Sequence, residues 1–140
     1  MGKILCATRG GEASHDAQDA AIALARERGD ELIFLYVADI SFLNQMAAPM
    51  VVDVEARLEK MGRFQLAMAQ ERAAAQGVSA GALVRRGQLR AELSAAAKEI
   101  SAVLVMLGHP GAREAVFDEE AIQALAAALE QETGTEVRIV

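Results

Sequence analysis

The chain has 140 residues, of which 53% are apolar and 24% charged, and it carries a formal net charge of −6. This length and composition predict one domain over residues 1–140 with a full hydrophobic core, and the acidic balance argues against a nucleic-acid binder with a broad basic face. The single cysteine, Cys6, excludes a disulfide framework within the chain, and no Cys/His spacing predicts a metal site. No apolar run is long enough for a membrane span, and residues 1–8 are too short and strand-like for a signal peptide, so we expect a cytoplasmic protein.

Short apolar runs alternate along the chain with longer segments of helical periodicity. The runs that are typical of buried parallel strands are residues 3–8, 31–38, 78–85, 102–107 and 136–140. Apolar residues at helical spacing predict helices over residues 14–28, 51–76, 88–100 and 118–133. Gly62 interrupts the second helix and is expected to mark a bend or a close contact. The order β-α-β-α-β-α-β-α-β predicts a flavodoxin-like or Rossmann-like α/β fold, with a five-stranded parallel sheet and helices on both faces.

Ligands of such sheets bind beyond the carboxyl ends of the strands, where the strand order reverses. The informative residues are therefore the segments that follow the predicted strands: residues 8–11, Asp39, residues 85–87 and residues 108–111. We see no nucleophile paired with a base and an orienting group, so no catalytic residue is predicted. Arg85, Arg86 and Arg90 form a local basic cluster, which predicts either a solvated strand end or a surface for an acidic patch of a protein partner.

Four segments of this chain resemble the universal stress protein family. They are KILCATRGGEASHDAQDAAIALA, GDELIFLYVAD, AVLVMLGHPG and EVRIV, which are similar to the family's first strand and helix, second strand, fourth strand with the start of its phosphate loop, and last strand. The resemblance implies a sheet of order 3-2-1-4-5 and a homodimer, and many family members bind ATP. In the members that bind ATP, the loop after the fourth strand follows the pattern G-x₂-G-x₉-G-[S/T], whose glycines let the backbone approach the phosphates.

This chain departs from that pattern. Gly108-His109-Pro110-Gly111 matches its first half, but Ala121-Ile122 stand where the second Gly-[S/T] pair would be. Arg9 replaces an acidic residue that the family's ATP binders place near the nucleotide. Asp118-Glu119-Glu120 open the last predicted helix, where a triphosphate would need positive potential. We therefore expect a non-catalytic regulatory or stress-response protein that does not bind ATP in the usual way and has no cofactor.

Two alternatives stay open. The first is an adenine-nucleotide-binding protein with an altered pocket, in which AMP or a smaller anion such as phosphate fits better than ATP because it brings less charge. Its candidate site residues are Ala7, Thr8, Arg9, Val37, Gly108, His109 and Gly111. The second is a small α/β enzyme without a recognisable catalytic motif.

Three further groups of residues carry expectations about burial and assembly. Val137, Ile139 and Val140 are candidate residues of a homodimer interface on the last strand, because an unpaired apolar edge strand invites pairing. Cys6 lies in the middle of the first strand and is expected to be a buried, inert thiol. The methionines Met46, Met50, Met61 and Met68 predict either core filling or an adaptable interface.

Overall fold

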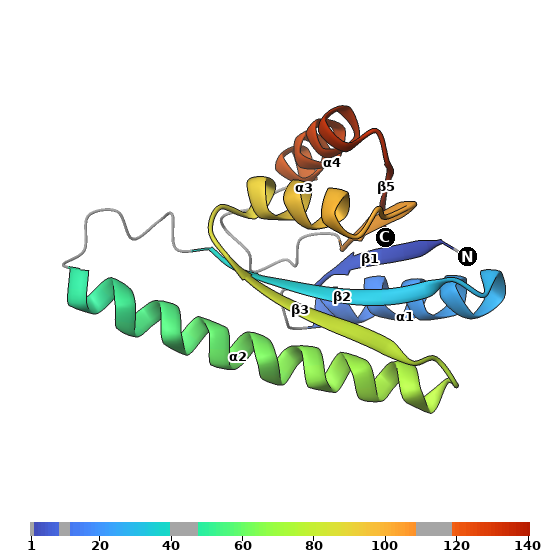
Figure 1. Cartoon of the computed structure of the whole chain (residues 1–140), viewed down its shortest axis with the longest axis horizontal. Coiled ribbons are helices and arrows are strands. Elements are labelled where there is room, and N and C mark those ends of the chain that lie inside the picture. Colours follow the sequence, from blue (N-terminus) through green and yellow to red (C-terminus); the bar gives the residue numbers. More distant parts are fainter. Residues whose placement is uncertain (1, 9–11, 40–47, 109–118) are drawn as a thin grey trace.

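The computed structural model describes residues 2–8, 12–39, 48–108 and 119–140 (Figure 1). Strands and helices alternate along these segments, as the apolar pattern predicts. The elements are β1 (Lys3–Ala7), α1 (Glu12–Arg28), β2 (Glu31–Ala38), α2 (Ala48–Ala75), β3 (Ala80–Arg86), α3 (Leu89–Glu99), β4 (Leu104–Leu107), α4 (Glu119–Thr133) and β5 (Glu136–Ile139). No described helix combines the length and the apolar character that crossing a bilayer requires.

The strands form one parallel sheet in the order β3-β2-β1-β4-β5, so the predicted fold class and the strand order implied by the family resemblance are both confirmed. β1 lies at the centre, where Cys6 pairs with Phe34 of β2 on one side and with Met106 of β4 on the other. From β1 the chain adds β2 and β3 on one side and then crosses over to add β4 and β5 on the other side. The carboxyl ends of β1 and β4 therefore flank the switch point, which is where such folds bind ligands.

The sheet is covered on both faces (Figure 1). α1 and α2 lie on one face and pack with Ile4, Cys6 and Phe34, while α3 and α4 lie on the other face and pack with Leu5 and Leu35. Successive side chains of a strand point to opposite faces, so a strand that is buried on both faces is apolar without alternation. This explains why β1 and β2 appear in the sequence as continuous apolar runs.

Three of the helices end in the same way, and this accounts for the late start of two strands. After α1, α2 and α3, an amide donates to the carbonyl five residues earlier: Asp30 to Ala25 (3.1 Å), Val78 to Ala73 (2.9 Å) and Ala102 to Ala97 (2.9 Å). The preceding residue has a positive φ in each case, as in a Schellman motif: Gly29, Gly77 and Ser101. Val78 and Ala102, which were predicted to begin strands, therefore close helices instead, and β3 and β4 begin two residues later.

Gly62 marks a close contact between α2 and the sheet. A Cβ built on this residue would lie 2.2 Å from Cδ1 of Tyr36 on β2, far inside van der Waals separation. α2 runs continuously from Ala48 to Ala75, three residues longer at its start than predicted. Pro49 is accommodated in the first turn, where its missing N–H removes no intrahelical hydrogen bond. The close-contact alternative for Gly62 is thus confirmed.

Candidate functional site at the carboxyl edge of the sheet

The candidate site residues on β1 point to different faces of the sheet. Thr8 is 1% exposed, its N–H donates to the carbonyl of Leu35 (2.8 Å), and its Oγ1 accepts a hydrogen bond from Nε2 of the buried Gln18 (2.7 Å). Its hydroxyl therefore lies under α1. Ala7 packs on the opposite face, with the cluster beneath α3 and α4, and Val37 packs against the same cluster. The sequence grouped these three residues, and the fold separates Thr8 from the other two.

Ala7 and Gly108 meet at a cavity between the sheet and the helices α3 and α4. The other walls include Leu89 and Leu93 of α3 and Ile122 and Leu125 of α4. The volume left between these side chains is about 10 Å³. That is roughly the space of a single water, whereas pockets for small organic ligands span ~300–1,000 Å³. Among the described residues, the aliphatic side chains of α3 and α4 therefore leave little space beside Ala7 and Gly108.

The N-termini of α3 and α4 both lie near this cavity, and both are supplied with carboxylates by the chain itself. Gln88 precedes α3 in extended conformation and makes no side-chain cap. Instead, Oδ2 of Asp39, at the end of β2, accepts a hydrogen bond from the N–H of Leu89 (2.9 Å). Glu119 and Glu120 stand in the first turn of α4. Helix N-termini attract anions because their free N–H groups and dipoles are positive. Here the carboxylates of Asp39, Glu119 and Glu120 already lie at these N-termini and reduce their positive potential.

Arg9, His109, Gly111 and Asp118 lie outside the described residues, so the predictions that concern them stay predictions. Within the described segments, no three His, Cys, Asp or Glu side chains gather as a metal site would require. Cys6 is fully buried, as expected, and desolvation raises the pKa of its thiol to about 12. The thiolate, which is the reactive form, is therefore suppressed.

The predicted basic cluster is resolved into ion pairs within the chain. Arg85 and Arg86 are neighbours on β3, so their side chains point to opposite faces of the sheet. Arg85 binds Glu92 (2.9 Å) and Glu99 (2.6 Å) of α3. Arg90 binds Glu132 of α4.

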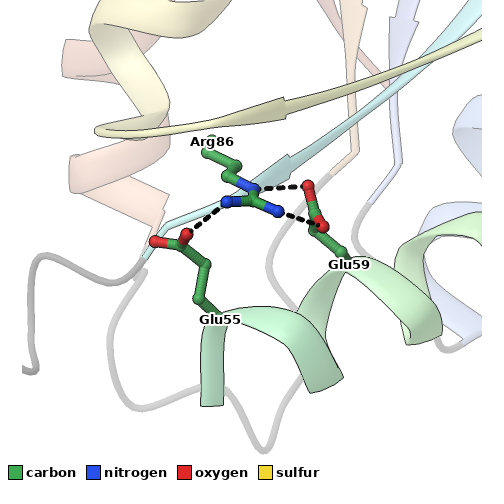
Figure 2. Close-up of polar contacts among 3 residues, drawn as sticks. All are labelled: Glu55, Glu59 and Arg86. Atoms are coloured by element: carbon green, nitrogen blue, oxygen red, sulfur yellow. Dashed lines mark hydrogen bonds and ion pairs between the residues drawn. The ribbon is translucent and has the colours of Figure 1, made fainter. Parts of the chain in front are cut away.

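Arg86 reaches α2 on the other face of the sheet (Figure 2). Its guanidinium binds Glu59 through two nitrogens (2.5 and 2.6 Å) and Glu55 through a third (2.8 Å). The hydrogen bonds from Arg86 lower the pKa of Glu59, and the same bonds raise the pKa of Arg86. Arg85 and Arg86 thus link β3 to α3 on one face of the sheet and to α2 on the other. The sequence did not predict these ion pairs, because the acidic partners lie on other elements.

Of the candidate dimer residues, Val137 and Ile139 lie on β5, at one edge of the sheet, and Val140 follows it directly. Val137 and Ile139 are half-buried against the cluster beneath α3 and α4, and Val140 is half-buried against the cluster on the opposite face. Glu136 and Arg138 alternate with them and form an exposed ion pair (2.7 Å). The N–H of Val137 donates to Oε1 of Glu130 on α4 (3.0 Å).

The fold defines a flavodoxin-like α/β protein, and the described residues at its carboxyl edge enclose a small apolar cavity beside Ala7 and Gly108. The family model of the universal stress protein family matches residues 1–117, and the chain belongs to this family. "Universal stress protein YxiE" of Bacillus subtilis (strain 168) is 30% identical over 117 residues, which cover 78% of this chain and 79% of the relative.

Solved structures of the family share the whole fold. The universal stress protein UspA from Lactobacillus plantarum has a TM-score of 0.84 at 18% identity, covering 99% of this chain and 97% of its own. A family protein from Arabidopsis thaliana, solved with AMP bound, has a TM-score of 0.69 at 12% identity, covering 100% of this chain and 91% of its own. At these identities the likeness shows the fold alone. The family model and the Bacillus subtilis relative confirm the family that the sequence resembles.

Proposed function

We propose that this protein is a cytoplasmic, non-catalytic regulatory member of the universal stress protein family that does not bind ATP in the family's usual way. The proposal is supported by the groups that the chain itself places at the carboxyl edge of the sheet, among the described residues. The carboxylate of Asp39 caps α3, two glutamates open α4, and leucines of α3 leave about 10 Å³ beside Ala7 and Gly108. A ligand with three or four negative charges would have to approach these acids and displace these side chains.

Thermal unfolding with ATP, ADP, AMP, adenosine and phosphate, with and without magnesium, tests this proposal. A ligand at 100 times its dissociation constant stabilises the native state by about 2.7 kcal/mol, which is a readily measured shift. We expect no shift with ATP at millimolar concentration. A clear shift with ATP would contradict the proposal.

Charge variants separate repulsion from steric filling. Glu119→Gln with Glu120→Gln removes two charges at the start of α4. Glu27→Gln with Glu31→Gln is the matched control, because both residues are exposed and lie where α1 ends and β2 begins, at the opposite edge of the sheet. If only the variant at Glu119 and Glu120 gains ATP binding, charge repulsion prevents ATP binding in the wild type. If neither variant gains it, the small volume of the cavity is the cause.

The second candidate function is the binding of AMP or a smaller anion through an altered pocket, and the AMP-bound relative from Arabidopsis thaliana favours it. Its site would comprise Ala7, Thr8, Val37 and Gly108 together with Arg9, His109 and Gly111. AMP brings less charge toward Glu119 and Glu120 than ATP does. A thermal shift with AMP but not with ATP would support this candidate, and Arg9→Glu would then abolish the shift. No shift with AMP, adenosine or phosphate would exclude it.

We also propose a homodimer through β5, supported by its position at the edge of the sheet. The amide of Val137 points away from β4, since it donates to Glu130, and an edge-to-edge pair would use it. Val137→Pro removes this N–H and should yield a monomer in sedimentation velocity. Val137→Ala loses a similar amount of side-chain packing but keeps the N–H, so it should remain dimeric. A monomeric wild-type chain at micromolar concentration would refute the proposal.

A further inference from the structure

The outer face of α2 carries an apolar stripe that no part of the described chain covers. Met61, Phe64 and Met68 are 58%, 65% and 40% exposed, although they lie in the middle of a long helix. The opposite face of α2 packs on the sheet through Leu66, Ala69 and Ala73. Of the two alternatives for the methionines, core filling is therefore wrong for Met61 and Met68. Met46 and the side chain of Met50 lie outside the described part of the chain.

The stripe is bounded by charges of opposite sign at equal distances from its centre. Arg57 lies seven residues before Phe64 and Glu71 lies seven residues after it, and both are exposed. Residues 57, 61, 64, 68 and 71 follow a 4-3-4-3 spacing, which places them on one seam of the helix as in a coiled coil. This seam is ~21 Å long, from the helical rise of 1.5 Å per residue. A shallow hollow of about 520 Å³ beside it is lined by Arg57, Lys60, Met61, Phe64 and Gln65.

The charges at the two ends of this stripe are complementary to each other under a two-fold axis. When a second α2 runs antiparallel with the axis at Phe64, a residue n positions before Phe64 faces a residue n positions after it on the other copy. Arg57 then faces the partner's Glu71, and Glu71 faces the partner's Arg57. A parallel pair would place like charges together, so the charges select the antiparallel orientation.

We propose that the seam of α2 binds the seam of a second copy of this chain in antiparallel orientation, with Met61, Phe64 and Met68 at its core and two Arg57–Glu71 pairs at its ends. The apolar part is short compared with the ~800 Å² per partner of a standard stable interface, so the association is weak and depends on concentration. α2 lies along β2 and β3, whereas β5 forms the opposite edge of the sheet (Figure 1). The α2 seam therefore acts independently of the β5 dimer and joins such dimers into larger assemblies.

Sedimentation velocity of the full chain over a concentration series tests the seam. Phe64→Glu should abolish the concentration-dependent step, while Val103→Glu, at an exposed apolar residue on another surface, should leave it unchanged. Arg57→Glu and Glu71→Arg should each weaken self-association about tenfold, because each replaces two attractive pairs by two repulsive ones. The double variant Arg57→Glu with Glu71→Arg should restore it. Far-UV circular dichroism of each variant confirms that it is folded.

Three results would overturn the proposal. Failure of the charge exchange to restore association would exclude the antiparallel pairing. Association that survives Phe64→Glu but is lost in Val137→Pro would assign self-association to β5 alone. Absence of any concentration-dependent step in the wild-type chain, whether monomer or dimer, would exclude self-association through the seam.

Discussion

Replacing Gly62 by alanine tests how closely α2 packs on the sheet. The added Cβ would lie 2.2 Å from Cδ1 and 2.6 Å from Cε1 of Tyr36, whereas carbon atoms pack at ~3.5–4.0 Å. The Tyr36 ring or the helix must therefore move by about 1.3 Å, and Tyr36 is only 9% exposed. Overpacking of this kind costs ~1–3 kcal/mol, while alanine gains about 1 kcal/mol over glycine in a helix. Since the contact is very short, we expect a net loss of about 1–2 kcal/mol.

Urea unfolding followed by circular dichroism measures this loss, and the melting temperature should fall by about 4 °C per kcal/mol. The same substitution in a Tyr36→Leu background separates the clash from the helix propensity. Without the ring, Gly62→Ala should become neutral or stabilising by up to ~1 kcal/mol. The reasoning is refuted if Gly62→Ala is as stable as the wild type while Tyr36 is present.

Three other predictions follow from single contacts. Asp39→Ala should lower the free energy of unfolding in urea by about 1 kcal/mol, because it removes the acceptor for the Leu89 N–H. Asp39→Asn should retain part of the stabilisation, because its amide oxygen can still accept this hydrogen bond. Equal stability of the wild type and both variants would show that the cap contributes nothing. Arg86 lowers the pKa of Glu59 below its usual 4.5, so the stabilisation is present above that value and is lost as the pH falls through the folded-state pKa. Arg86→Gln should therefore melt below the wild type at neutral pH and approach it as the pH falls through the folded-state pKa of Glu59. A gap that does not depend on pH would contradict this account. Burial raises the Cys6 pKa to about 12, so stability should decline as the pH rises above about 9, where the unfolded thiol ionises, and Cys6→Ser should lack this component of the decline.

The fold could be predicted because its strands are buried on both faces and its helices end at clear signals. β1, β2 and β4 are continuous apolar runs, and Gly29 and Gly77 follow two of the helices. The errors fall at helix and strand ends. Ser101 adopts a positive φ of 56° without being glycine, so the sequence gives no sign that α3 closes through Ala102.

The site was harder to predict because its decisive contacts join residues that are far apart in sequence. The carboxylate of Asp39 caps a helix that begins 50 residues later, and only the parallel topology brings the end of β2 beside the start of α3. Helical periodicity shows that Leu89 and Leu93 face inward but not that they and Ile122 line the same cavity. Thr8 was assigned to that pocket from its position after β1, but strand alternation turns its hydroxyl toward Gln18.

α2 is much longer than the strands on which it packs. Its 28 residues span ~42 Å, whereas the eight residues of β2 span ~26 Å. Among its described side chains and Gly62, the buried positions all lie from Gly62 onward: Gly62, Leu66, Ala69 and Ala73. Among the described side chains of the first half, Leu58 packs against the core, and Glu55 and Glu59 bind Arg86 of β3. We therefore expect the amides of the second half to exchange only when the whole domain unfolds, whereas those of the first half exchange through a local opening whose free-energy cost the bonds from Arg86 increase.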